Sequence, residues 1–241
     1  MFLTILHLYP DLLNLYGDIG NLTTLSQRLL WRGIQVQQQQ LLLGEQLNLD
    51  RADIVLIGGG EGLLWERTLE NLAANAATLR QGVAAGLVVL GINEGYQLLG
   101  EYYQTLEGRR LPMMGVIPCY TQEAPQRLVV DLRWQATAEN SGAEVVGYEN
   151  HLGRTWLLEG ASAWGQVLEG QGNNGEDGSE GARYKNAFGS YSHGPLLPKN
   201  PALADYLLNL ALQRGYPGFQ LPPLDDSWEQ HAWQQAASRR R

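Results

Sequence analysis

Two short apolar segments of the sequence run directly into glycine turns that precede helix-forming stretches. Residues 53–57 lead into Gly58-Gly59-Gly60, and residues 87–92 lead into Asn93-Glu94-Gly95. Buried strands of a parallel sheet are continuous apolar runs, and their alternation with helices is typical of a sheet covered by helices on both faces. We therefore predict an α/β fold with a mostly parallel central sheet. The predicted strands are 2–9, 34–43, 53–57 and 87–92, and the predicted helices are 66–81, a short one ending at 99, and one capped by Asn21 that ends near 33.

The second half of the chain has a different pattern, in which short strands are separated by turns, as in antiparallel sheets. Residues 170–181 contain five glycines, which predicts a mobile loop. A closing helix is predicted at 201–214. We expect one domain at 1–221 and a polar tail at 222–241, whose Trp228 and Trp233 dock on that domain. The predicted strands of this half are 128–134, 144–148, 165–168 and 186–191.

Charge, cysteine content and hydropathy exclude several classes of protein. The sequence has 17 Lys and Arg residues against 25 Asp and Glu residues, and its net charge of −8 argues against a nucleic-acid-binding protein. The single cysteine, Cys119, excludes an internal disulfide and a Cys-rich zinc site. No apolar run is long enough to span a membrane, and residues 1–9 lack the basic start of a signal peptide. We expect a cytoplasmic protein without metal or cofactor.

Three segments carry residues that fit catalytic chemistry. Gly58-Gly59-Gly60 can point backbone N–H groups at a developing oxyanion. Residues 91–95 have the form G-x-Nuc-x-G, the tight turn that exposes a nucleophile, but the central residue is Asn93, which is not a nucleophile. His193 follows an apolar segment and fits either a general base or a buried structural histidine.

Together with longer motifs, these segments resemble the CobB/CobQ-like branch of the class I glutamine amidotransferases, and within it the GatD-type subunits of lipid II isoglutaminyl synthase. The resemblance runs in order through most of the chain. The matching segments are Leu-Asn-Leu-Tyr-Gly-Asp-Ile-Gly-Asn at 13–21, Ile-Gly-Gly-Gly at 57–60, Gly-Tyr-Gln-Leu-Leu-Gly at 95–100, Gly-Tyr-Glu-Asn-His-Leu-Gly-Arg-Thr at 147–155, Tyr-Lys-Asn at 184–186 and His-Gly-Pro-Leu-Leu-Pro-Lys-Asn at 193–200.

The resemblance implies a defined activity and partner. GatD-type subunits hydrolyse glutamine with a Cys–His pair and pass ammonia to MurT, a Mur-ligase-like subunit that uses ATP to amidate the D-glutamate of the lipid II stem peptide. By this resemblance His193 is the base and Arg127 holds the glutamine substrate. The backbone N–H groups of Gly59, Gly60 and Glu94 would form the oxyanion hole. Asp18 and Glu149 lie in family motifs without an assigned role.

The chain departs from the family at the nucleophile. The family pattern there is a cysteine followed by two glycines, and this chain has Asn93-Glu94-Gly95. Cys119 lies outside any nucleophile turn and does not replace the missing thiol. Residues 61–65 are also more apolar than the family pattern near the glutamine pocket. Removal of a nucleophile typically lowers turnover by about 10⁶-fold, so we expect this chain's own glutaminase activity to be lost.

Three functions remain open from the sequence. The chain can be a GatD-like subunit that supports a MurT-like ligase, or conducts free ammonia to it, in a heterodimer. It can instead be a sensor or scaffold whose pocket, lined by Asn93, Glu94, Arg127 and His193, binds another small amide, amine or carboxylate. A hydrolase of altered mechanism would require a nucleophile that the sequence does not show. Co-purification with a Mur-ligase-like protein separates the first two.

Overall fold

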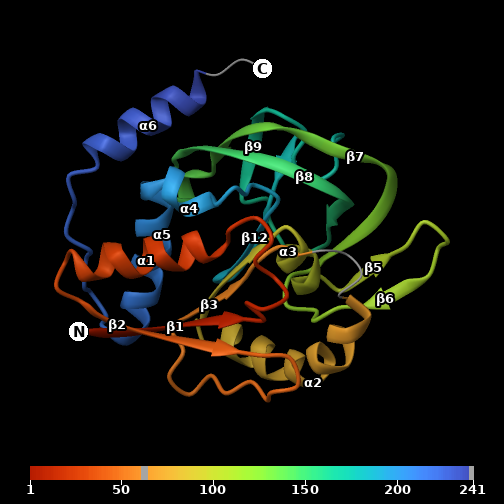
Figure 1. The fold of residues 1–241 in the computed structure, drawn as a ribbon, viewed down its shortest axis with the longest axis horizontal. Coiled ribbons are helices and arrows are strands. Elements are labelled where there is room, and N and C mark those ends of the chain that lie inside the picture. The colour runs from red at the N-terminus through yellow and green to blue at the C-terminus, as the bar shows by residue number, and fades with distance from the viewer. Residues whose placement is uncertain (61–64, 239–241) are drawn as a thin grey trace.

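The computed structural model describes residues 1–60 and 65–238. For residues 65–68 only the backbone is described. The central sheet has the strand order β11-β12-β4-β3-β1-β2 (Figure 1). All neighbours in this sheet are parallel except the pair β11–β12, which confirms the predicted α/β class with a mostly parallel sheet. The strands are β1 (Phe2–Leu8), β2 (Gln35–Leu41), β3 (Ile54–Ile57), β4 (Val88–Ile92), β11 (Ala182–Tyr184) and β12 (Ala187–Ser190).

Helices cover both faces of this sheet because its inner strands β3 and β4 are apolar and buried on both sides. Ile54 and Leu56 of β3 pack with α1 and α5, whereas Val55 and Ile57 pack with α2. Figure 1 shows α1 and α5 on one side of the sheet and α2 on the other. The helices are α1 (Ile19–Leu30), α2 (Trp65–Ala84), α3 (Glu94–Leu99), α4 (Leu196–Lys199), α5 (Pro201–Gly215) and α6 (Ser227–Ala237).

A second sheet lies beside the first and has the order β10-β9-β7-β5-β6, with β8 also paired to β7. The long strands β7 and β8 form an antiparallel pair whose register shifts between Glu123 and Leu128. A short 3₁₀ helix (Ala138–Asn140) connects them. The strands are β5 (Tyr102–Gln104), β6 (Arg110–Pro112), β7 (Cys119–Ala136), β8 (Glu144–Leu157), β9 (Gly165–Glu169) and β10 (Ser179–Glu180).

Three local predictions were wrong. The segment 186–191, predicted among antiparallel strands, forms β12 and pairs in parallel with β4 of the central sheet. The glycine-rich segment 170–181 is a structured loop that includes β10. The Glu149 carboxylate accepts hydrogen bonds from its backbone, and the buried Asn173 and Asn174 donate hydrogen bonds to other residues of the same segment. Helix α1 begins two residues before Asn21, whose amide oxygen instead accepts the N–H of Leu197.

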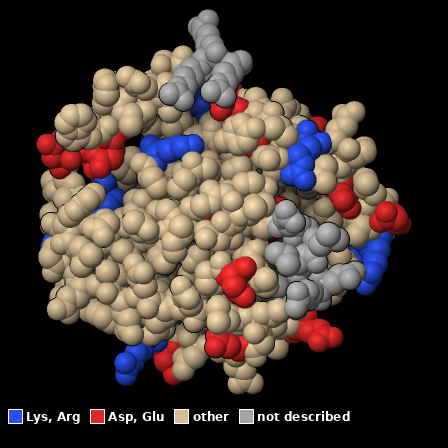
Figure 2. All heavy atoms as spheres, viewed as in Figure 1, with Lys and Arg blue, Asp and Glu red and all other residues tan. Residues whose placement is uncertain are grey.

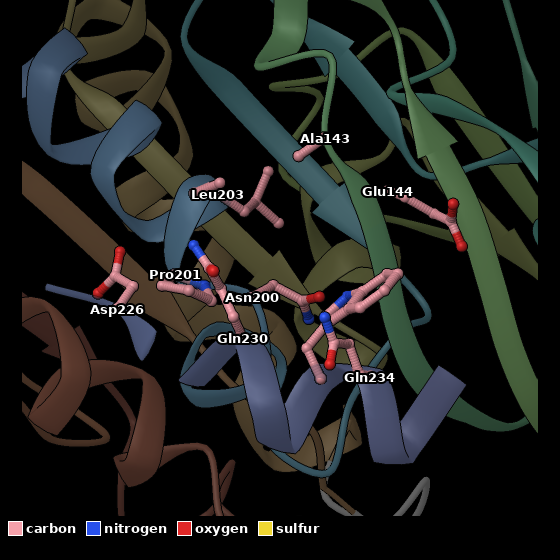
Figure 3. A pocket seen from close by; sticks show the side chains of 10 residues that line it. Ala143, Glu144, Asn200, Pro201, Leu203, Asp226, Gln230 and Gln234 are labelled. Atoms are coloured by element: carbon pink, nitrogen blue, oxygen red, sulfur yellow. The ribbon is translucent and has the colours of Figure 1, made fainter. Parts of the chain in front are cut away.

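The tail is anchored on the domain by a buried arginine of α1. The Arg28 guanidinium is 2% exposed and pairs with Asp205 of α5 at 2.6 Å and with Asp226, just before α6, at 2.7 Å. Trp233 lines a cavity of about 280 Å³ beneath α6, but Trp228 is 84% exposed, so only one of the two tryptophans contacts the domain as predicted. Figure 3 shows this cavity with side chains from α5 and α6 around it.

The visible surface carries no continuous basic patch. In Figure 2 the Lys and Arg side chains are scattered among acidic and uncharged ones. None of the helices in the described residues is long and apolar enough to cross a membrane.

Candidate active site

The parallel pairing of β3, β4 and β12 brings three predicted segments to one edge of the central sheet. Gly58 follows β3, Asn93 follows β4, and Tyr191 to His193 follow β12. The N–H of Asn93 donates to the Ser190 carbonyl at 2.9 Å, which connects the ends of β4 and β12. His193 is joined in turn to Tyr148 of β8 by two backbone hydrogen bonds. The glycine turn, the elbow and the histidine segment therefore share one site.

Asn93 occupies the elbow in the strained conformation expected of a nucleophile turn. Its φ is +52° and its ψ is −110°, which a residue with a side chain rarely adopts. The flanking glycines are required by close packing. A Cβ at Gly91 would lie 2.6 Å from the Gly95 carbonyl oxygen, and a Cβ at Gly95 would collide with the Ile57 carbonyl oxygen. The backbone of the elbow is thus present without a nucleophilic atom.

The Asn93 side chain is fully buried and only partly satisfied. Its Nδ2 donates to the Asn150 carbonyl at 3.3 Å, and the amide also hydrogen-bonds the Tyr16 hydroxyl. Its Oδ1 has no partner among the described residues. A carboxamide nitrogen has its electron pair delocalised into the carbonyl, so neither atom of this amide can replace a thiolate in attack on glutamine.

The N–H groups assigned to the oxyanion hole already donate to carboxylates. Gly59 donates to Asp18 Oδ2 at 2.8 Å, and Gly60 donates to Glu94 Oε2 at 2.9 Å. The backbone N–H of Glu94 also interacts with its own carboxylate. Burial raises the pKa of both carboxyl groups, and the hydrogen bonds from the glycine N–H groups offset part of this rise. The resulting pKa is about 6 for Asp18 and about 7 for Glu94. Negative charge developing on a substrate here would compete with these two carboxyl groups.

His193 lies against the same corner in an apolar setting. Its ring stacks on Tyr16 with centroids 4.2 Å apart and meets Tyr148 edge-on at 5.8 Å. Burial, together with smaller effects of His151 and Lys199, lowers its pKa to about 4, so the ring is neutral at pH 7. Its Nε2 has no hydrogen-bond partner among the described residues. The neutral imidazole has an unpartnered nitrogen that can accept a proton, but its lowered pKa makes it a weaker base at pH 7 than an ordinary histidine.

Arg127 projects from the irregular part of β7 and remains exposed. Its guanidinium donates to Asn150 Oδ1 at 2.9 Å, hydrogen-bonds the Tyr16 hydroxyl, and acts electrostatically on Glu94. The structure therefore brings the predicted residues Asn93, Glu94, Arg127 and His193 around one tyrosine. Sequence reasoning missed Tyr16, although it lies inside the recognised segment 13–21.

A buried polar network supports the strand ends that carry these residues. The Glu149 carboxylate accepts the N–H groups of Gln171 and Gly172 at 2.7 and 2.8 Å, which assigns this motif residue a structural contact. His151 stacks on Tyr191 with centroids 3.6 Å apart. Glu180 accepts a hydrogen bond from the Ser190 hydroxyl at 2.6 Å and was also missed in the sequence analysis. Its only sequence signal was a carboxylate within a glycine-rich segment.

Cys119 lies in the hydrophobic core at the start of β7 and is 0% exposed. Burial raises the pKa of its thiol well above the ordinary value, which keeps it protonated and unreactive. The predicted apolar replacement at 61–65 falls outside the described residues, apart from the backbone of Trp65 at the start of α2.

Comparisons with known proteins agree with this geometry. A sequence model of the CobB/CobQ-like glutamine amidotransferase domain matches residues 4–201. The lipid II isoglutaminyl synthase (glutamine-hydrolyzing) subunit GatD of Staphylococcus aureus is 38% identical over 232 residues, 96% of this chain and 93% of that protein. The subunit of the same name from Streptococcus pneumoniae is 37% identical over 93% of this chain and 86% of that protein.

The fold comparison gives the same class. A crystal structure of a glutamine amidotransferase superposes with a TM-score of 0.56 at 16% identity, covering 86% of this chain and 98% of that one. A second glutamine amidotransferase, from Thermotoga maritima, gives a TM-score of 0.53 at 13% identity, covering 97% of this chain and 90% of that one. Matched by the domain model along most of its length and by the two GatD subunits along nearly all of it, the chain belongs to the CobB/CobQ-like glutamine amidotransferase family as a homologue of GatD.

Proposed function

We propose that this chain is the GatD-like subunit of a lipid II isoglutaminyl synthase and that it does not itself release ammonia from glutamine. The two GatD relatives, which align along nearly the whole chain, support the subunit role. The observation that carries the second part is the intact elbow with Asn93 at its centre, φ +52°. The proposed partner is a MurT-like ligase, in a heterodimer that works in the cytoplasm, where ATP is available.

The geometry supports loss of chemistry at the first step. Glutamine hydrolysis at such an elbow begins when a thiolate attacks the side-chain carbonyl carbon and the histidine accepts the thiol proton. The carbonyl oxygen then becomes an oxyanion that backbone N–H groups stabilise. Here the attacking electron pair is absent, and the Gly59 and Gly60 N–H groups are bound to Asp18 and Glu94. His193 remains in place without a proton to accept.

The proposed subunit would hold the ligase in its active form or pass on ammonia that it has not made. Relatives that hydrolyse glutamine produce glutamate and ammonia, and formation of an isoglutaminyl amide consumes the ammonia. If this chain makes none, the amide nitrogen enters as free ammonium. The alternative, a sensor or scaffold for a different partner, predicts no stable complex with a Mur-ligase-like protein.

An isotope experiment tests the proposal. The chain is co-expressed with the Mur-ligase-like protein from the same genome, and the purified complex receives ATP, a D-glutamate-containing lipid II substrate, and either amide-¹⁵N-glutamine or ¹⁵N-ammonium. We expect a complex that incorporates label from ammonium and not from glutamine. Incorporation from glutamine would overturn the loss of glutaminase. Failure to form a complex, or to amidate with either nitrogen source, would overturn the subunit role.

A further inference from the structure

The Tyr16 side chain lies among the groups that a glutamine side chain would have to reach. Its ring stacks on His193 with centroids 4.2 Å apart and 18° between the ring planes. The same ring lies over the glycine turn, because a Cβ at Gly59 would be 2.7 Å from Tyr16 Cδ2. Its hydroxyl hydrogen-bonds the Asn93 amide and accepts from the Arg127 guanidinium. Tyr16 therefore contacts the predicted base, oxyanion turn, elbow and substrate-binding arginine at once.

The loop that carries Tyr16 is bound to the glycine turn on both sides of the tyrosine. The N–H of Leu15 donates to the Gly59 carbonyl at 3.0 Å, and the N–H of Gly59 donates to Asp18 Oδ2 at 2.8 Å. These bonds place the Tyr16 ring over the turn independently of the ring's own contacts. Tyr16 lies between β1 and α1, outside any helix or strand, so a substitution there interrupts neither element.

The residue at the elbow strengthens the hold on this tyrosine. Tyr16 belongs to the segment 13–21 that resembles the family, whereas Asn93 replaces the cysteine of the family pattern. An amide is a full hydrogen-bond partner for a hydroxyl, and a thiol is only a weak one. Asn93 is 0% exposed, and its Nδ2 also donates to the Asn150 carbonyl at 3.3 Å, so the amide is itself held in place. The substitution that removes the nucleophile thus adds a contact to Tyr16.

We propose that Tyr16 closes the glutamine corner (Gly59, Asn93, Arg127 and His193) and that the Asn93 amide and Arg127 hold it closed. The proposal deepens the proposed function and rests on it for the assignment of this corner as the glutamine site. A glutamine side chain in contact with these four residues would have to occupy the volume of the Tyr16 ring, and close-packed groups cannot share a volume. The same closure argues against a pocket for another small amide at this corner.

Access of a reagent to His193 tests the closure in the natural chain. Diethyl pyrocarbonate acylates neutral imidazole nitrogens that solvent reaches, and mass spectrometry gives the rate at each histidine. The reaction is run at pH 8, where an ordinary histidine is also neutral, so that the rates report access rather than charge. The exposed His231 is the internal reference.

Two variants release the tyrosine in different ways. Tyr16→Phe keeps the ring and removes the hydroxyl, and Asn93→Gly removes the amide at a positive φ that glycine tolerates. Tyr102→Phe is the matched control, because Tyr102 is also half-buried and stacks on Tyr120 of the second sheet with centroids 5.0 Å apart.

We expect His193 in the natural chain to react at least about tenfold more slowly than His231, because the loop must open first. Tyr16→Phe and Asn93→Gly should each raise the His193 rate by about threefold or more, since each removes a contact of the closed loop. Tyr102→Phe should leave it unchanged. Equal His193 rates in the natural chain and in Tyr16→Phe would overturn the closure, and a rate unchanged by Asn93→Gly would overturn the role of Asn93.

An introduced thiol tests the same closure at the elbow itself. In Asn93→Cys, modification by iodoacetamide reports position 93, because Cys119 is 0% exposed and burial raises its pKa well above the ordinary value. Adding Tyr16→Ala should raise the limiting rate at high pH by about tenfold or more, and adding Tyr102→Ala should not. The limiting rate reports access, because the introduced thiol is then fully ionised. A limiting rate unchanged by Tyr16→Ala would overturn the proposal.

The two proposals fail in different ways. If the complex incorporates nitrogen from ammonium and not from glutamine, but neither reagent detects closure, the role of Tyr16 is wrong and the proposed function stands. If the complex incorporates nitrogen from glutamine, or no complex forms, the proposed function is wrong whatever the rates at His193.

Discussion

At the residue scale, the elbow has the backbone of a nucleophile turn, but the side chains at positions 93 and 94 are an amide and a carboxyl group rather than a nucleophile. Asn93 keeps the positive φ of a nucleophile elbow, and Glu94 places a carboxylate on the N–H of Gly60. The position of this elbow could be predicted from the sequence, because its flanking glycines and the neighbouring strand and helix are visible as local patterns. The hydrogen bond between Asp18 and Gly59 could not be predicted, since these residues are 41 positions apart and only the fold brings them together. Tyr16 was missed for the same reason.

Because carboxyl groups of this chain are buried, we predict that its free energy of unfolding falls as the pH rises. Burial raises the pKa of Glu180 from 4.5 to about 7, so between these values the folded chain binds a proton that the unfolded chain releases. The free energy of unfolding therefore decreases from about pH 4.5 to 7, by roughly 1.4 kcal/mol for each pH unit of difference between the two pKa values. Glu180→Gln removes this contribution and should lose less stability over the window than the natural chain.

Urea denaturation at pH 5 and pH 8 measures the difference. The exposed Glu159→Gln serves as the control and should follow the natural chain. An identical pH dependence in Glu180→Gln and the natural chain would show that Glu180 is already ionised in the folded protein at pH 5.

At the scale of elements, the site depends on close packing between the elbow helix and its neighbouring strands. Local periodicity was sufficient to predict β1, β3, β4 and α5 with nearly correct bounds. It was insufficient for the segment 170–181, because Glu149 of β8 and two buried asparagines order a sequence that is glycine-rich and locally flexible. It also missed the pairing of β12 with β4, which joins residues about a hundred positions apart.

The contact between α3 and β12 predicts an intolerant glycine. A Cβ at Gly189 of β12 would overlap the Tyr96 ring of α3, which is itself fully buried. Gly189→Ala should therefore lower the free energy of unfolding by about 2 kcal/mol or more, as overpacking of a core does. Gly215→Ala is the matched control, since a Cβ there meets no atom within 4 Å. Equal stabilities of the two variants in urea denaturation would refute this packing argument.

Helix α6 is expected to depend on one ion pair at its start. No residue of α6 is buried, and Asp226 connects it to the buried Arg28 through two hydrogen bonds at 2.7 and 2.9 Å. Asp226→Asn should increase the rate of limited proteolysis within 222–238 by about tenfold, equivalent to about 1.4 kcal/mol of weaker docking. Asp225→Asn removes a neighbouring carboxylate that forms no ion pair among the described residues, and should leave the rate unchanged. Equal rates in the two variants would mean that other contacts hold α6.

At the scale of the whole molecule, residues of both sheets form the site. The central parallel sheet presents the glycine turn, Asn93 and His193 at one edge, and β7 and β8 of the second sheet add Arg127 and Asn150. The sequence predicted the class of fold and the family because these depend on motifs that run along most of the chain. It could not predict that the carboxyl groups of Asp18 and Glu94 occupy the glycine turn, which depends on the assembled fold.

The most direct test of the central claim is glutamate release from glutamine by the chain in complex with its Mur-ligase-like partner. We predict no release by the natural chain, because the elbow has no attacking atom and the N–H groups of Gly59 and Gly60 are bound to carboxylates. The double variant Asn93→Cys/Glu94→Gly, measured beside it, shows whether the rest of the glutamine site is intact, and release by this variant would confirm it. Glutamate release by the natural chain would contradict the loss of glutaminase activity and would require a nucleophile elsewhere in the site.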